Sequence, residues 1–201
     1  MKIIRFNLGP LETNCLLVHN DKEALIVDVG GDPSEVLEYL RKNNLKLTDI
    51  LVTHMHFDHV LGVADLVTAT GAAVWANERD EYLMTGNKSM GFPDPKPFKY
   101  TNVEEGEKSW LGLECQMLST PGHTPGSISY YFKELGAIFC GDVLFYRSVG
   151  RSDFPGGNGD TLFASIRNKI YSLPEDTVVY PGHMQETKVG DEKRLNPFVK
   201  G

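Results

Sequence analysis

The chain has 201 residues, of which 41% are hydrophobic and 23% are charged. This length and composition exclude a disordered tail or a low-complexity polymer. They are enough for one domain with a substantial core, which we expect to span residues 1–201. The 20 Lys and Arg against 27 Asp and Glu give a net charge of −7. Because sequence-independent nucleic-acid binding needs a basic face, we expect no nucleic-acid partner.

The start of the chain and the cysteines indicate a cytoplasmic protein. The apolar stretch before Arg5 is far too short for an export signal, and no run approaches the roughly 18 apolar residues that cross a membrane. Cys15, Cys115 and Cys140 lie in apolar runs and form no C-x-x-C pair. We therefore expect buried, reduced cysteines, no thiolate zinc site and no membrane partner.

Strands and helices interleave in the first half of the chain. Apolar and β-branched runs predict strands over residues 2–8, 14–19, 23–28, 49–53 and 71–76. Asn20-Asp21 is typical of a hairpin turn. Helices are predicted from Asp32, the expected cap residue, to Asn43, and then over residues 59–70 and 77–85.

The second half continues in the same way. A loop with three prolines and two glycines spans residues 86–99, and Phe92 and Phe98 make it a candidate lid. Asp160 is the expected cap of a helix that Pro174 ends. Further strands are predicted over residues 114–119, 127–133, 137–140 and 177–180. Such interleaving indicates a layered α/β or α+β fold.

One hexapeptide stands out chemically. Residues 54–59 read His-Met-His-Phe-Asp-His, and three imidazoles with a carboxylate are not typical of a core. The motif directly follows the predicted strand 49–53, and sites in sheet proteins lie where strands end. Imidazole and carboxylate ligands suit zinc, iron and manganese, so the motif indicates a metal site.

Three further residues of the same kind follow predicted strands. They are His123, Asp142 and His183, and each is directly preceded by a glycine, which lets the chain bend closely around a metal. Five histidines and two aspartates exceed the needs of one four-coordinate ion. They fit two ions about 3.5–4 Å apart with one bridging carboxylate. The sixth histidine, His19, ends a strand beside the predicted turn, and we expect it at the surface.

This set of residues resembles that of the metallo-β-lactamase superfamily, whose H-x-H-x-D-H motif stands here as His54, His56, Asp58 and His59. The resemblance covers nearly the whole chain and implies an α+β fold, the four-layer αββα sandwich. It also implies two divalent ions, zinc in the first place, with iron or manganese as alternatives. The ligands implied are His54, His56 and His123 for the first ion, Asp58, His59 and His183 for the second, and Asp142 as the bridge.

Within the superfamily, residues 141–145, 150–155 and 196–198 resemble segments of the short, single-domain bacterial type II glyoxalases. The resemblance implies hydrolysis of a hydroxyacylglutathione thioester, such as S-lactoylglutathione, by a metal-bridging hydroxide that Asp58 also holds. It further implies that Arg151 contacts the glutathione part of this small-molecule substrate, with Arg147 as another candidate.

Two alternatives stay open at this point. A mono-iron glutathione persulfide dioxygenase of the same superfamily has a segment similar to residues 150–154 and binds iron through two histidines and one carboxylate. Another metal-dependent hydrolase, such as a lactonase, is the second alternative. Two ions per chain favour hydrolysis, whereas one iron with oxygen consumption favours the dioxygenase. The sequence indicates no oligomeric state.

Overall fold

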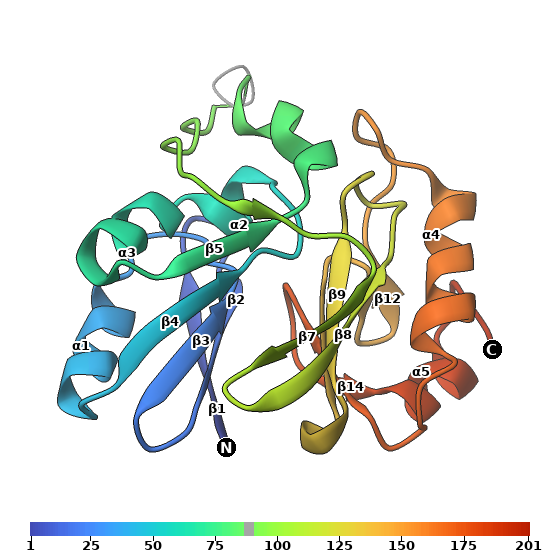
Figure 1. The fold of residues 1–201 in the computed structure, drawn as a ribbon. Helices are drawn as coiled ribbons and strands as arrows, with labels where there is room; N and C mark the ends of the chain where they lie inside the picture. Colours follow the sequence, from blue (N-terminus) through green and yellow to red (C-terminus); the bar gives the residue numbers. More distant parts are fainter. Residues whose placement is uncertain (87–90) are drawn as a thin grey trace. The chain divides into compact units, whose positions relative to one another are not determined.

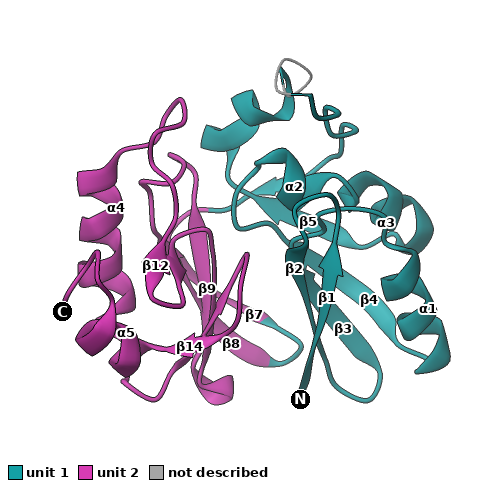
Figure 2. Cartoon of the chain, turned by 180° about the vertical axis from the view of Figure 1, so that it is seen from behind, with its two compact units in different colours: residues 1–103, 110–112 teal, residues 104–109, 113–201 magenta. Residues whose placement is uncertain are grey.

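The computed structural model describes residues 1–86 and 91–201. Figure 2 colours the two units into which they group, one of residues 1–103 and 110–112, the other of residues 104–109 and 113–201. Each unit has a six-stranded sheet of its own. Within the described ranges, no helix is long and apolar enough to cross a membrane. The expected single domain over residues 1–201 stays a prediction.

The sheet of the first unit has the strand order β1-β2-β3-β4-β5-β6 (Figure 1). Its strands are β1 (Lys2–Leu8), β2 (Thr13–His19), β3 (Glu23–Val27), β4 (Lys46–Leu51), β5 (Ala73–Ala76) and β6 (Thr101–Asn102). Its helices are α1 (Ser34–Lys42), α2 (Phe57–Val60), α3 (Val63–Thr70) and the 3-10 helix η1 (Glu78–Met84). Strands β1 to β3 pair antiparallel, and β3 to β6 pair parallel. The antiparallel β2–β3 pair confirms the predicted hairpin.

Parallel pairing sets the place of the chemically interesting residues. Because neighbouring parallel strands end at the same edge of a sheet, the residues that follow them are brought together there. Asp28 follows β3, the motif 54–59 follows β4, and Asn77 follows β5. The prediction that the histidine-rich motif follows a strand is therefore confirmed, although β4 ends at Leu51 and not at residue 53.

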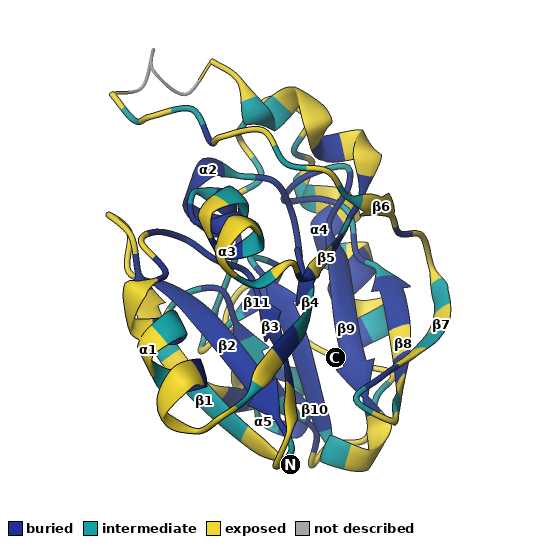
Figure 3. Ribbon diagram, turned by 60° about the vertical axis from the view of Figure 1, so that its left-hand side comes forward, coloured by how far each residue is buried: buried dark blue, intermediate teal, exposed yellow. Residues whose placement is uncertain are grey.

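One face of this sheet carries the core of the first unit. Alternate residues of neighbouring strands, among them Leu17 and Ile26, pack against Val36 of α1 and Leu66 of α3. All four side chains are fully buried, and burying a side chain of this kind contributes about 1.5–3 kcal/mol. Figure 3 shows the consequence, with β2 and β3 buried and α1 exposed on its outer side.

A second packing contact in this unit joins its two tryptophans. Residues 110–112, which are the last residue of β7 and the turn after it, belong to the first unit. There the Trp110 indole donates a hydrogen bond to Asp49 Oδ1 at 3.2 Å, and Trp75 donates to the same oxygen at 2.7 Å. The two indoles meet edge to face, with ring centroids 5.6 Å apart. One carboxylate therefore ties this turn to β4 and β5.

The predicted helix over residues 59–70 is instead two helices, α2 and α3, with a break at Leu61 and Gly62. The Gly62 amide donates to the Val29 carbonyl at 2.9 Å, and a Cβ on Gly62 would collide with the Gly31 carbonyl oxygen. This close approach of two chain segments requires glycine and interrupts the helix. The predicted helix 77–85 is the 3-10 helix η1.

Two further expectations in the first unit need correction. His19 is 4% exposed and not at the surface, because Tyr39 of α1 covers it, with the Tyr39 hydroxyl 3.1 Å from His19 Nε2. Helix α1 starts at Ser34 with Pro33 at the cap position. Asp32 still accepts hydrogen bonds from the backbone N–H and the hydroxyl of Ser34.

The sheet of the second unit has the strand order β14-β13-β10-β9-β8-β7. Its strands are β7 (Gly106–Trp110), β8 (Leu113–Ser119), β9 (Ile128–Phe132), β10 (Ala137–Gly141), β13 (Val178–Pro181) and β14 (Thr187–Lys188). A separate hairpin consists of β11 (Leu144–Phe145) and β12 (Ser148–Val149). The helices are η3 (Lys133–Leu135), α4 (Gly159–Ser165), the π-helix η4 (Ile166–Ile170) and α5 (Val189–Leu195).

In this sheet, too, the strands that precede candidate ligands end at one edge. Strand β10 pairs antiparallel with β9 and parallel with β13, and β9 pairs antiparallel with β8. Strands β8, β10 and β13 therefore run in the same direction. His123 follows β8, Asp142 follows β10 and His183 follows β13.

Helix α4 and the residues after it cover one face of the second sheet. Leu162, Ile166 and Ile170 are buried against residues of β10 and β13. The helix begins one residue before Asp160, however, and its cap is Asn158, whose side chain accepts the Thr161 N–H at 2.8 Å. Strands β6, β7, β11, β12 and β14 and helix α5 were not predicted.

Two remaining expectations concern the cysteines and the loop 86–99. All three cysteines are buried and reduced, as predicted. Residues 87–90 of the loop lie outside the described residues. In the described part, the Phe92 ring stacks on Phe57 with centroids 4.3 Å apart, and Phe98 packs against the core. Its role as a lid stays a prediction.

Candidate metal centre

The motif after β4 presents four candidate ligands in the first unit. His54, Asp58 and His59 are buried, and His56 is half-buried at the cap position of α2. The His54 ring lies 4.8 Å from the ring of His56 and 4.0 Å from that of His59, measured between centroids. Because α2 begins within the motif, Asp58 and His59 project from its first turn.

Asp28 lies behind this motif as a buried hydrogen-bond acceptor. Its Oδ1 accepts the backbone N–H of Thr53 at 2.8 Å, and its Oδ2 accepts the Thr53 hydroxyl at 2.8 Å. His59 Nδ1 lies 2.8 Å from the same Oδ2. Asp28 has the left-handed backbone φ of 56°, which turns the chain after β3 toward the motif. Since a carboxylate only accepts, His59 must donate from Nδ1, and its lone pair is on Nε2.

The same argument fixes the tautomer of His54. The Thr53 hydroxyl donates its proton to Asp28. Toward His54 Nδ1, which lies 3.1 Å away, the Thr53 oxygen can therefore only accept a hydrogen bond. His54 therefore also carries its lone pair on Nε2. Asp58 is held by Thr13, whose hydroxyl donates to Asp58 Oδ2 at 3.2 Å. Partners of this kind orient metal ligands and raise their basicity.

The second unit presents His123, Asp142 and His183 from the ends of three strands. His123 Nδ1 lies 2.6 Å from the Arg151 carbonyl oxygen, which can only accept, so the His123 lone pair is also on Nε2. Asp142 Oδ2 lies 3.7 Å from His123 Nε2 and 3.6 Å from His183 Nε2. One carboxylate oxygen thus stands near both imidazoles.

The backbone around His123 depends on a glycine. Gly122 has a φ of 133°, and a Cβ there would collide with the backbone of Leu162 at the start of α4. The Gly122 carbonyl accepts the Asn158 N–H at 2.8 Å, and Ser165 donates its hydroxyl proton to the Pro121 carbonyl at 2.7 Å. Helix α4 therefore fixes the loop that carries His123.

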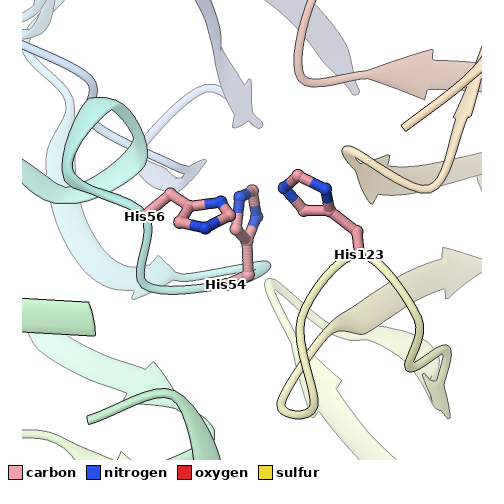
Figure 4. Close-up of side chains that lie close together, drawn as sticks. All are labelled: His54, His56 and His123. Carbon is pink, nitrogen blue, oxygen red and sulfur yellow. The ribbon is translucent and has the colours of Figure 1, made fainter. Parts of the chain in front are cut away.

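The chemistry of the donor set fits a metal ion. Among the described residues there are three groups in which each residue offers one ligand atom and the atoms of the group lie within 4.8 Å of one another; Figure 4 shows the imidazoles of the first. The groups are His54, His56 and His123; His54, His59 and Asp142; and Asp58, His59 and His183. The first and third have the same members as the two ligand sets that the resemblance implies. With imidazole nitrogen and carboxylate oxygen as the only ligand atoms, these groups suit zinc, iron or manganese.

The two candidate substrate residues have carboxylate partners. Arg151 is 64% exposed and donates from Nε and from one terminal nitrogen to Asp153, at 2.9 and 2.7 Å. This hydrogen bonding raises the pKa of the Arg151 guanidinium and lowers the pKa of Asp153. Arg147 is 28% exposed and forms an ion pair with the fully buried carboxylate of Glu192.

The histidines and aspartates that follow the strands of this α+β fold form a candidate metal centre. A family model described as the metallo-beta-lactamase superfamily matches residues 8–183. The chain belongs to the metallo-β-lactamase superfamily, and the predicted fold class is confirmed. It is a metal-dependent hydrolase of that superfamily.

Two relatives match nearly full length. The chain is 34% identical to a probable metallo-hydrolase, YqgX, of Bacillus subtilis, over 100% of this chain and 99% of the relative. It is 37% identical to the hydroxyacylglutathione hydrolase GloC of Haemophilus influenzae, over 94% of this chain and 93% of the relative.

Several solved structures are similar to the chain over most of its length. The crystal structure of BLEG-1, a B3 metallo-β-lactamase, has a TM-score of 0.93 and 36% identity and covers 100% of both chains. TTHA1623, solved in a di-iron-bound form, has a TM-score of 0.88 and 38% identity, covering 98% of this chain and 100% of that one. ETHE1 from Myxococcus xanthus has a TM-score of 0.81 and 30% identity, covering 98% and 84%.

Sequence reasoning missed the groups behind the ligands. Asp28 follows β3 as the candidate ligands follow their strands, and this position was the signal that could have found it. Thr53 directly precedes the motif, but nothing in the sequence shows that its hydroxyl bridges Asp28 and His54. The acceptor for His123 is a backbone carbonyl, for which side-chain patterns carry no signal.

Proposed function

We propose that the chain is a binuclear metallohydrolase that cleaves a hydroxyacylglutathione thioester of the S-lactoylglutathione type. The observation that carries the proposal is that two of the three-residue ligand groups have no residue in common, so that each can hold an ion of its own. Asp142, with one oxygen within 3.7 Å of both His123 and His183, is the proposed bridging ligand. The 37% identity to GloC supports the substrate class.

The residues present are suited to hold two divalent ions, which we propose to be zinc, with iron or manganese as alternatives. His54, His56 and His123 would hold one ion, and Asp58, His59 and His183 the other. When bound, two such ions supply a nucleophile from water at neutral pH and polarise a carbonyl oxygen. A thiolate is a good leaving group, so the protein need not supply a strong acid for it.

The side chains of this protein contribute orientation and charge. The Nδ1 protons of His54, His59 and His123 are held by Thr53, Asp28 and the Arg151 carbonyl, which keeps each Nε2 lone pair available for coordination. Asp58 provides a carboxylate that can also accept a proton from water. Arg151 would bind a glutathione carboxylate, for which it must exchange its present partner Asp153.

A single experiment tests this proposal. Purified protein is assayed for S-lactoylglutathione hydrolysis, and the metal content of the same sample is measured. We expect turnover with close to two ions per chain. Two bound ions without turnover would contradict the thioester substrate and leave another hydrolase, such as a lactonase. One ion or none in an active sample would contradict the binuclear centre.

A second candidate is a mono-iron glutathione persulfide dioxygenase. The segment 150–154 and the likeness to ETHE1 support it. The dioxygenase predicts one iron per chain and oxygen consumption with glutathione persulfide. The hydrolase predicts two ions per chain and no oxygen consumption. An oxygen electrode and iron analysis of the sample used above distinguish the two activities. For both candidates the proposed location is the cytoplasm and the proposed partner a small molecule.

A further inference from the structure

A buried carboxylate in helix α5 holds a hairpin of the second unit. Glu192 is fully buried, and its two oxygens accept four hydrogen bonds. One oxygen accepts from the Arg147 guanidinium and from the Thr187 hydroxyl, the latter at 2.7 Å. The other accepts the Arg147 backbone N–H at 3.1 Å and the Asn196 side-chain amide at 2.9 Å. A charge this deeply buried needs such a complete set of partners.

These contacts converge on the turn between β11 and β12. Arg147 lies in that turn with a left-handed φ of 55°, so its backbone N–H and its side chain both reach Glu192. Asn196, at the end of α5, donates also to the Ser148 carbonyl at 3.1 Å. Figure 1 shows α5 and β12 in the second half of the chain, and these hydrogen bonds join them. Glu192 and Asn196 thus fix the tip of the hairpin.

The two ends of the same hairpin carry parts of the metal centre. Asp142 lies two residues before β11, and Arg151, whose carbonyl accepts the His123 Nδ1 proton at 2.6 Å, lies two residues after β12. Gly150 N–H donates to the Val143 carbonyl at 3.3 Å and closes the hairpin at its base. A Cβ on Gly150 would collide with the Asp142 carbonyl, so the two ends have little room to shift.

We propose that Glu192 and Arg147 are positioning residues of the metal centre. By fixing the hairpin tip, they hold the Arg151 carbonyl where it accepts from His123, and so keep the His123 lone pair on Nε2. The Arg147 guanidinium is engaged with Glu192, which assigns it this positioning role in place of contact with substrate. The proposal rests on the metal centre proposed above.

The test uses the full chain loaded with Co²⁺ and compares Glu192→Gln with the wild-type protein. Glutamine keeps the shape, but its amide nitrogen cannot accept, so two of the four donors lose their partner. We expect one of the two ions to bind about 10–100-fold more weakly in chelator competition. We also expect the NMR resonance of the His123 Nδ1 proton to shift, which a loss of global stability alone does not produce.

Two further variants complete the design. Arg147→Met removes the cationic partner of Glu192 at a side chain that is partly exposed, so this variant tests the proposal even if Glu192→Gln fails to fold. We expect the same loss of Co²⁺ affinity. Glu175→Gln is the matched control, because Glu175 is an exposed carboxylate outside the helix that pairs with Arg194 of α5. It should change neither Co²⁺ affinity nor the His123 resonance.

Each outcome bears on a definite claim. Wild-type affinity and an unchanged His123 resonance in a folded Glu192→Gln or Arg147→Met protein overturn the positioning role, even if the melting temperature falls. If the wild-type chain itself binds no Co²⁺, the proposed metal centre is wrong, and this inference fails with it.

Discussion

His59 donates its Nδ1 proton to Asp28, with the two atoms 2.8 Å apart and both side chains buried. Asp28 also accepts from the backbone and the hydroxyl of Thr53. The residue before the histidine motif and a residue within it thus share one acceptor. The tautomers of His54 and His59 both follow from the charge of this one carboxylate, which itself follows a different strand.

The Asp28→Asn substitution tests this relationship. An amide nitrogen in place of Oδ2 would face two donors, the Thr53 hydroxyl and His59 Nδ1, and would favour the wrong His59 tautomer. We expect metal affinity to fall about 10–100-fold, which chelator competition measures. Asp49→Asn is the control, because the hydrogen bonds that Asp49 accepts among the described side chains come from two indoles and not from the motif. Equal affinities in Asp28→Asn and wild type would show that the carboxylate does not orient the ligand.

Asp58 is expected to act both as a ligand and as a proton acceptor. The Asp58→Ala protein should therefore lose the second ion and most of its turnover, as measured by metal analysis and by the thioester assay. Asp65→Ala is the control, since Asp65 is an exposed aspartate of α3 that pairs with Lys96. An Asp58→Ala protein that keeps two ions per chain and full turnover would refute the assignment.

Arg151 and its partner Asp153 give a prediction about substrate affinity. Arg151→Gln should raise the KM for S-lactoylglutathione with little change in kcat, because a cation that only binds the substrate acts equally in the ground and transition states. Asp153→Asn should lower the KM, since it removes the carboxylate that now occupies Arg151. If both substitutions leave the KM unchanged, Arg151 does not contact the substrate.

Of two glycines with positive φ, Gly122 and Gly112, substitution by alanine should lower the free energy of unfolding more at Gly122. A Cβ at Gly122 collides with the Leu162 backbone, whereas a Cβ at Gly112 has no atom of another described residue, its two chain neighbours apart, within 4 Å. Gly112→Ala should cost only the left-handed strain, about 1–2 kcal/mol. Gly122→Ala should cost about 1–3 kcal/mol more through overpacking. Urea unfolding measures both free energies, and equal losses would contradict the steric argument.

The burial of the three thiols leads to two predictions, one about their reactivity with a thiol reagent and one about how stability depends on pH. Burial raises the pKa of Cys140 to about 12 and raises the pKa values of Cys15 and Cys115 as well. At pH 8 a thiol reagent should label none of them in the native protein and all three after unfolding. Labelling of the native protein at the rate seen after unfolding would contradict their burial.

The sign of the pH effect follows from proton binding. The folded state keeps the thiol protons that the unfolded chain loses near its ordinary pKa of about 8.5. The free energy of unfolding therefore has its full value below that pH. Above it, the free energy of unfolding declines by up to about 1.4 kcal/mol per thiol per pH unit until the pKa of the folded state is reached. Urea unfolding at two alkaline pH values measures the decline, and Cys140→Ala should make it less steep.

The candidate ligands could be predicted because each is a charged or imidazole side chain at the end of an apolar strand, a local signal. The break between α2 and α3 could not, because its cause is a tertiary contact between Gly62 and residues 29–31, far away in the sequence. The apolar pattern continues through Gly62 and therefore favoured one helix. His19 was misplaced for the same reason, since Tyr39 of α1 covers it.

Short segments were the other difficulty. Strands β11 and β12 have two residues each, too few for a periodic pattern, yet their hairpin carries the acceptor for His123. At the start of α4, Asn158 and Asp160 are both good cap residues, and only the Thr161 hydrogen bond decides between them. These details were therefore decided by hydrogen bonds that the sequence pattern does not show.

The tryptophan pair has an optical consequence. Trp75 and Trp110 are the two tryptophans of the chain, and both indoles donate to Asp49 in the first unit. The tryptophan fluorescence of the protein therefore originates at one place, where residues 110–112 meet β4 and β5. An emission change during unfolding would report the release of that turn, and a dye on the second unit would be needed to follow the rest of the chain.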